Sequence, residues 1–392
     1  MTDIFTLLPY GRNKKFIKFF DPTVAEVYYK SKVVDLISGK VSDIPSGEFI
    51  SKLNKISLET NKSIVTHLFY EYGFLLQSNL EDLVDEDEPL AIFIDYQSVI
   101  EIDIEKKFDE ISLQNKKKVN FQKYKKAFET GVKNLYLGNC YQFNLTFLFN
   151  YLFKNSSIDD FVYAFMANKE SLGSFAHLTY LGPWKKAILS NSPESLFQSK
   201  KTGNKIKIQT APIKGTVKLG KKVDVEHLWR DLDKDPKNQA ELFMITDLLR
   251  NDLNNIELPV AKVIKKKAPL LAPGILHQMS LIQVDVSPDV SLGQIVQALF
   301  PGGSITGAPK KRVLQILHEL EESPRGIYCG STILMHRERC DASINIRTAF
   351  IDFEQGELIY GAGGGITLLS DPKDEFQEML VKRDSFIDLF FK

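Results

Sequence analysis

The chain has 392 residues, and its 50 lysines and arginines balance its 50 aspartates and glutamates. This length can bury a large core in one big domain or two. The balanced charge leaves no broad basic field, so a nucleic acid partner is not expected. We also expect no signal peptide and no membrane span, because no apolar run approaches ~20 residues. Three cysteines are too few, and odd in number, for a disulfide framework, which favours a cytoplasmic protein.

The N-terminal part is the hardest to interpret. Residues 1–110 mix short apolar runs with acidic turns, and only Pro89 to Asp95 predicts a buried strand. Residues 116–137 have helical spacing and stop at Gly138, which predicts a helix.

Strands dominate the next stretch. Residues 187–189 and, after a Gly203-Asn204 turn, 205–209 have strand patterns. Lys214 follows directly, between Pro212 and Gly215. The end of a buried β pattern is a poor place for a solvated charge, so this lysine is a candidate functional residue.

Helices and strands alternate in the remainder. The Asp-Pro pairs at 235–236 and 371–372 predict helix starts, and Pro309 opens a further helix. Residues 326–335 and 341–353 have strand patterns. Long β runs with inserted helices favour an α+β fold.

Two glycine-rich segments could approach an anion closely. Residues 361–365 follow a predicted strand, and residues 302–310 lead into a helix N-terminus. The first lacks Rossmann spacing, and the second has Ala308-Pro309 where a P-loop has its Lys-Ser/Thr pair. Neither therefore predicts nucleotide binding.

Glu241 and Glu378 each lie in a predicted helix that packs on the protein. Two carboxylates that converge from separate helices suit Mg²⁺, which takes oxygen ligands and keeps several waters. The alternative is two exposed helix glutamates, and periodicity alone favours it.

Strand alternation places Ser343, Asn345 and Arg347 on one polar face. An arginine there could bind a carboxylate through two hydrogen bonds, although a surface strand arginine is equally compatible with the pattern. Cys140 lacks the glycine-rich elbow and histidine partner of a glutaminase, so this chain is not expected to make its own ammonia.

Several motifs together resemble the chorismate-binding enzymes from about Phe121 onward. They are Asn191–Glu194, Ala211–Thr216, the Glu241 helix, Phe300–Lys310 and Gly361–Gly365. The resemblance implies an anthranilate-synthase-component-I-like α+β fold, in which two α/β subdomains pack their sheets as a sandwich around a central cleft. Residues 1–110 would then be a diverged N-terminal part, and 111–392 the chorismate-binding catalytic region.

The resemblance also implies roles. Glu241 and Glu378 match the family's Mg²⁺ ligands, and Glu194 matches its general acid. The implied substrate-binding residues are Tyr328, Arg347, Gly363, Gly364, Gly365, Lys382, His277, Gln142, Thr216 and Ser304. Many relatives carry further acids three residues before the first metal glutamate and three after the second, where this chain has Asn238 and Val381.

Two positions select a branch of the family. Isochorismate- and salicylate-forming relatives carry a water-activating lysine where this chain has Gln142, and anthranilate-forming relatives carry alanine where it has Lys214. The branch that resembles it replaces the 4-hydroxyl of chorismate with an amine, toward 4-aminobenzoate and folate. Ammonia would come from a separate glutamine amidotransferase subunit.

In this hypothesis Lys214 adds to ring carbon 2 while Glu194 protonates the departing 4-hydroxyl, and ammonia then displaces the lysine. An anthranilate-forming enzyme with an incidental Lys214 is the first alternative. A non-catalytic chorismate-binding subunit is the second.

Overall fold

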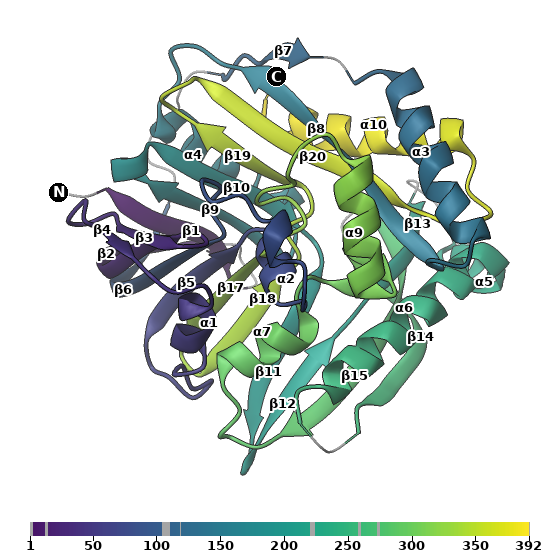
Figure 1. Cartoon of the computed structure of the whole chain (residues 1–392), viewed down its shortest axis with the longest axis horizontal. Coiled ribbons are helices and arrows are strands. Elements are labelled where there is room, and N and C mark those ends of the chain that lie inside the picture. Colours follow the sequence, from purple (N-terminus) through teal and green to yellow (C-terminus); the bar gives the residue numbers. More distant parts are fainter. Residues whose placement is uncertain are drawn as a thin grey trace.

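The computed structural model describes residues 3–11, 15–103, 110–117, 119–219, 224–257, 260–272 and 275–391. Its antiparallel strands form two sheets that share one long strand, β2 (Lys15–Tyr28) (Figure 1). The first sheet continues from β2 through β1 (Ile4–Tyr10), β9 (Phe175–Leu181), β10 (Lys186–Ser192), β19 (Thr348–Asp352), β20 (Glu357–Ile366) and β8 (Gln142–Leu152).

The second sheet leaves β2 on its other side. It runs through β6 (Ala91–Ile102), β5 (Ser63–Leu68), β17 (Ser331–His336), β18 (Arg339–Ser343), β11 (Ser195–Thr202), β12 (Lys205–Thr210) and β15 (Ile275–Val286). Strand β15 also pairs with β13 (Ile213–Lys218) and β14 (Lys262–Ala272). Short strands β3 (Lys32–Asp35), β4 (Val41–Asp43), β7 (Gln114–Lys117) and β16 (Gly307–Ala308) extend the edges.

The two sheets pack face to face where they meet. Phe19, Val27 and Ile94, from β2 and β6, share one buried cluster with Ile188 of β10 and Val65 of β5. Residues from both sheets therefore enclose one core, as in a sandwich. The expected α+β fold is confirmed.

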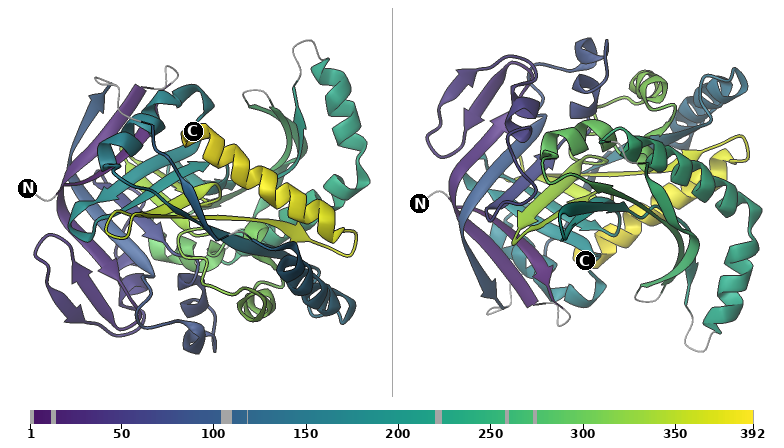
Figure 2. Two further views of the ribbon diagram at one scale, coloured as in Figure 1. Left: turned by 90° about the horizontal axis from the view of Figure 1, so that it is seen from above. Right: turned by 90° about the horizontal axis from the view of Figure 1, so that it is seen from below.

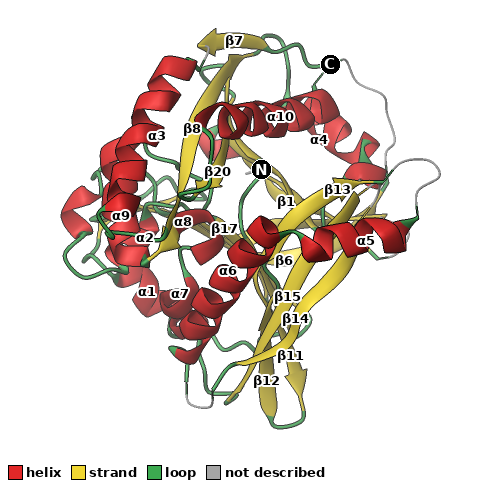
Figure 3. Ribbon diagram, turned by 90° about the vertical axis from the view of Figure 1, so that its right-hand side faces the viewer, coloured by secondary structure: helices red, strands yellow, loops and turns green. Residues whose placement is uncertain are grey.

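Helices cover the outer faces (Figures 2 and 3). The first sheet packs on α3 (Phe121–Tyr136), α4 (Ile158–Ala167), α9 (Lys310–Leu320) and α10 (Pro372–Phe390). The second packs on α1 (Glu48–Leu53), α2 (Tyr72–Leu75), α6 (Pro236–Asn254), α7 (Leu292–Leu299) and α8 (Gly303–Thr306), and α5 (Val225–Lys234) precedes α6. None of the helices in the described part of the chain is both long and apolar enough to cross a membrane.

The predicted helix starts are confirmed. Asp235 caps α6 by accepting a hydrogen bond from the Asn238 N–H, and Asp371 caps α10 in the same way. Helix α3 begins at Phe121, later than expected, because residues 114–117 pair with β8 instead.

Two predicted strands are wrong in extent. Residues 341–353 do not form one strand, because the chain leaves the second sheet after β18 and enters the first at β19. Arg347 lies in this crossing with a φ of 52°, so strand alternation does not orient it. The second predicted strand began at Gly326, but residues 326–329 form turns and the strand starts only at Ser331.

The glycine run does not follow a strand, as the sequence suggested, but forms the second half of β20. Gly361 to Gly365 pair with Leu148 to Asn144 of β8. A methyl group built on Gly361 would lie 2.2 Å from the Tyr328 ring, so only glycine admits that ring here.

The N-terminal strands are part of the same sheets. Strand β1 pairs with β9, and β5 pairs with β17. The division of the chain at residue 110 stays a prediction.

A buried ion pair ties the loop after α9 to the core. The Arg325 guanidinium contacts both carboxylate oxygens of Glu321 at 2.8 Å and donates to the Asn144 carbonyl. We expect Arg325→Met to lower the free energy of unfolding by about 3–5 kcal/mol, because the buried Glu321 carboxylate loses its cationic partner and keeps only the hydrogen bonds from Thr146. Urea denaturation measures this loss.

The neighbouring surface pair is the matched control. Lys123 contacts Glu322 at 3.0 Å, and both side chains are about half exposed. Lys123→Ala should cost less than about 1 kcal/mol. Equal losses in the two variants would contradict a structural role for the buried pair.

Candidate active site

Lys214 projects from β13 toward α6. Its Nζ lies 4.0 Å from Glu241 Oε2, and the two side chains are only 17% and 15% exposed. A β-bulge follows Lys214, at Gly215 with φ 76°, where a side chain would clash with Leu232. The bulge redirects the strand and so sets the direction of the lysine.

Glu194 lies in the turn between β10 and β11, where it is buried. Ser304 Oγ donates to its Oε1 at 2.9 Å. Burial raises the pKa of Glu194, while the Ser304 hydrogen bond and the charges of Lys214 and Lys382 oppose that rise. Both lysines therefore lie within electrostatic reach of one buried carboxyl group.

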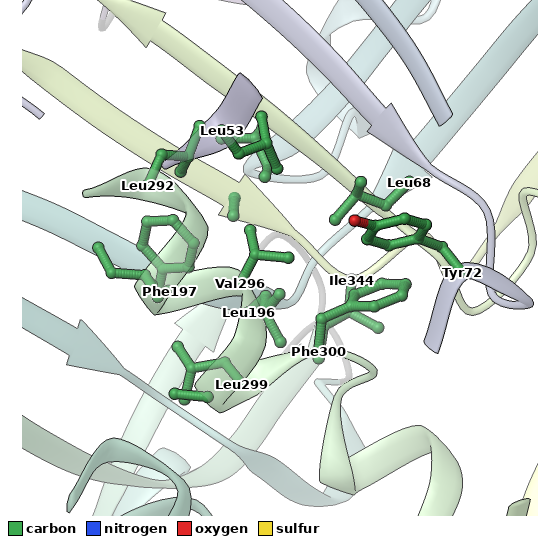
Figure 4. Close-up of a cluster of buried hydrophobic side chains, with 14 of the residues drawn as sticks. Leu53, Leu68, Tyr72, Leu196, Phe197, Leu292, Val296, Leu299, Phe300 and Ile344 are labelled. Carbon is green, nitrogen blue, oxygen red and sulfur yellow. The ribbon is translucent and has the colours of Figure 1, made fainter. Parts of the chain in front are cut away.

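Apolar packing holds this turn in place. Phe300 and Leu299, at the end of α7, lie in the same cluster as Leu196 and Ile344 (Figure 4). A methyl group on Gly302 would touch Ile344 at 3.0 Å, so the glycine-rich loop packs closely on this cluster. This packing places Ser304 of the loop within hydrogen-bond distance of Glu194.

Helix α10 supplies one acidic and one basic side chain to the candidate site, Glu378 and Lys382. Lys382 Nζ contacts Glu378 Oε1 at 2.7 Å and donates to the Gly363 carbonyl at 2.9 Å. Neighbouring glycines of β20 lie close to Lys382 and to Lys214. A methyl group on Gly364 would lie 4.0 Å from Lys382 Nζ, and one on Gly365 would lie 3.7 Å from Lys214 Nζ.

Gln142, on β8, adjoins the same glycine. Its side-chain amide is buried, and neither amide atom has a hydrogen-bond partner among the described residues. A methyl group on Gly365 would lie 2.5 Å from Gln142 Nε2. Gln142, Lys214 and Gly365 therefore adjoin one another.

His277, on β15, lies near Arg347 of the crossing between β18 and β19. Burial lowers the pKa of His277, and the nearby Arg347 charge lowers it further, against a hydrogen bond to the Gly215 backbone. The imidazole is therefore mainly neutral at pH 7. Tyr328 lies over Gly361, and burial raises its pKa, so its phenol stays protonated.

One predicted site residue and the two positions that depart from the family pattern remain to be placed. The Thr216 side chain lies outside the described residues. Asn238 donates through its side chain to Asp235 at 3.0 Å and so supports the start of α6. Val381 is 54% exposed on α10.

Glu375 is a site residue that the sequence reasoning missed. It precedes Glu378 by one helical turn, is 7% exposed and accepts a hydrogen bond from Ser370 at 2.8 Å. A methyl group on Gly364 would touch its Oε2 at 3.0 Å. The Glu-x-x-Glu spacing on α10 was the available signal, because such residues share a helix face.

The described chain has two cavities of similar size, and only the second reaches candidate site residues. One, of about 400 Å³, is lined by Glu71, Glu88 and Glu321, and the other, of about 420 Å³, reaches Tyr328 and Gly361. Neither has Lys214 or Glu241 in its lining. The candidate site rests on the contacts above rather than on these cavities.

Two lysines thus lie beside a strand of glycines and within electrostatic reach of a buried acid, and a neutral histidine lies near an arginine. This set can bind an anionic substrate and protonate a leaving group. Residues 97–388 match the family model of chorismate binding enzymes, and the chain belongs to that family.

The chain is also similar to individual curated members of the family. The chain is 33% identical to aminodeoxychorismate synthase component 1 of Klebsiella aerogenes over 264 residues, which are 67% of this chain and 56% of that protein. It is 36% identical to the Salmonella typhimurium protein of the same name over 251 residues, 63% and 53% of the two chains. The chain spans about half the length of these relatives.

Solved structures show the same fold. Anthranilate synthase component I from Streptococcus pneumoniae superposes with a TM-score of 0.77 at 20% identity, covering 94% of this chain and 91% of that one. The menaquinone-specific isochorismate synthase of Escherichia coli gives 0.69 at 16% identity, covering 99% and 89%. The anthranilate-synthase-component-I-like fold is confirmed.

The state of Glu194 can be measured directly. We expect Ser304→Ala to raise the pKa of Glu194 further, because a hydrogen bond that favours the carboxylate is lost. Carbon NMR of labelled glutamate carboxyl groups, assigned with Glu194→Gln, measures this shift. Ser190→Ala removes a buried hydroxyl that contacts Thr348 instead and should leave the titration unchanged. A midpoint that does not move in Ser304→Ala would contradict the contact.

Proposed function

We propose that the chain is component 1 of an aminodeoxychorismate synthase, which converts chorismate and ammonia to 4-amino-4-deoxychorismate. The observation that carries the proposal is the largely buried Lys214, which lies beside Glu241 and Gly365 and within electrostatic reach of the buried Glu194. The names of the relatives from Klebsiella and Salmonella support it.

The geometry suits covalent catalysis in two steps. The neutral Lys214 amine forms a bond to ring carbon 2, the double bonds shift, and the bond from carbon 4 to oxygen breaks. Glu194 gives its proton to that oxygen, which leaves as water. Ammonia then bonds to carbon 4, the bond from carbon 2 to Lys214 breaks, and the surplus proton returns to Glu194.

The other side chains would bind the substrate. Arg347 and Lys382 offer charge-assisted hydrogen bonds to its carboxylates, and Tyr328 offers a phenolic proton. His277, neutral at pH 7, adds a hydrogen bond without a charge. Burial of Glu194 keeps its pKa raised, which favours the protonated form that donation needs.

Glu241 and Glu378 are the residues that would hold Mg²⁺. Both carry carboxylate oxygens, and lysines lie beside them at 4.0 and 2.7 Å, as expected of carboxylates that could also ligate a metal cation. Within the described residues, no three acidic, histidine or cysteine side chains are grouped as a metal cage. Two carboxylates with water fit Mg²⁺, which would stabilise substrate carboxylate charge.

Ammonia is proposed to come from a separate glutamine amidotransferase. Cys140 is 2% exposed, and burial raises the pKa of its thiol, so it is a poor nucleophile. The designation "component 1" of the relatives agrees with a two-subunit enzyme.

Turnover tests the proposal. Purified protein with chorismate, Mg²⁺ and ammonium should form 4-amino-4-deoxychorismate without pyruvate, and glutamine should not replace ammonium. Anthranilate or salicylate as the main product would overturn the assignment. Chorismate binding without turnover would favour a non-catalytic subunit.

The covalent role of Lys214 has its own test. Lys214→Met should lower kcat by at least ~10³-fold, because the two-step path is lost. Lys205→Met, on the neighbouring β12, should retain wild-type turnover. Mass spectrometry of the wild-type protein quenched with chorismate should detect an adduct on Lys214. Unchanged amination by Lys214→Met would exclude the covalent step.

Metal binding is measurable without turnover. Calorimetric titration of Mg²⁺ should show an affinity at least ~10-fold weaker in Glu241→Gln and in Glu378→Gln. Glu319→Gln, exposed on α9, should bind as the wild type does. Equal affinities in all four proteins would place the metal elsewhere.

A further inference from the structure

Gln278 of β15 is a buried amide for which the fold provides no partner. Its side chain has no solvent exposure, and neither its Oε1 nor its Nε2 has a hydrogen-bond partner among the described residues. Burial of an unpaired amide is unfavourable. An apolar side chain would serve packing better at this position, so a structural role does not account for the glutamine.

The position of Gln278 is defined by strand pairing. Gln278 is directly opposite Lys214 in the antiparallel β13–β15 ladder, so the two side chains lie on the same face of the sheet. Ser280, two residues along the same face, accepts a hydrogen bond from Thr246 of α6 at 2.8 Å. This face therefore looks toward α6, the helix that carries Glu241.

Gln142 gives an independent indication that polar groups are missing here. It is the other glutamine in the described chain whose two buried amide atoms both lack partners, and it adjoins Lys214 at Gly365. Two unpaired amides, from β8 and β15, thus neighbour one amine. Buried polar groups are usually paired, so both are suited to hydrogen bonds that form only in the reacting complex.

We propose that Gln278 is a positioning residue for Lys214. The inference rests on the proposed function: when the Lys214 amine leaves Glu241 and turns to the ring, Gln278 Oε1 accepts one of its N–H bonds. The nitrogen lone pair is thereby aimed at carbon 2. No covalent bond of Gln278 changes, and its other amide atom remains available to the substrate.

Gln278→Met tests this role, because methionine keeps the length of the side chain and removes its hydrogen bonds. We expect kcat for amination to fall at least ~10-fold while KM for chorismate stays within about threefold. The melting temperature should rise, because an unpaired buried amide has been removed. A fall in both kcat and melting temperature, or an unchanged kcat, would overturn the proposal.

Gln283 is the matched control on the same strand. Its amide is already paired, with Gln209 at 3.0 Å and with Asp285. Gln283→Met should leave kcat unchanged and should not raise the melting temperature.

The split between kcat and KM distinguishes this role from a structural one, because a structural defect would lower the melting temperature as well. Failure of the wild type to aminate chorismate would instead defeat the proposed function.

Discussion

The candidate site depends on two chain crossings that are hydrogen-bonded to each other. The chain passes from the first sheet to the second after β10, and back again between β18 and β19. Ser192 Oγ donates to the Ile344 carbonyl at 2.6 Å, and the Ile344 N–H donates to the Glu194 carbonyl at 2.9 Å. The Asn191 N–H completes the link by donating to the Arg347 carbonyl.

These bonds explain why the two residues occur together. Glu194 and Arg347 are 153 positions apart in the sequence, yet each sits at a crossing that the other crossing stabilises. Backbone at a sheet crossing lacks a regular ladder, so its polar groups must be satisfied locally. The same irregularity frees the side chains from strand alternation and lets them point into the site.

Features that depend on neighbouring residues could be predicted from the sequence, and features that depend on distant segments could not. Asp-Pro helix starts and apolar helix stripes are local, and they predicted α6, α9 and α10 correctly. The family motifs predicted the fold. The predicted orientation of Arg347 was wrong, because it depends on the chain crossing between the sheets and not on the alternation of a strand.

Other residues were missed because their meaning depends on what packs over them. Glu375 has the pattern of an ordinary helix acid, and only the contact with Gly364 places it at the site. Gln278 has the pattern of a strand polar residue, and only the ladder places it opposite Lys214. The pairing of β5 with β17 joins distant segments, so the N-terminal part could not be assigned locally.

The glycines of β20 have a consequence for how such enzymes diversify. Gly361 and Gly365 offer bare backbone, and the groups above them, Tyr328, Gln142 and Lys214, all come from other segments. Any of these side chains can thus be exchanged without a change in the glycine backbone beside it. The glycine strand and the groups that face it can therefore vary independently of each other.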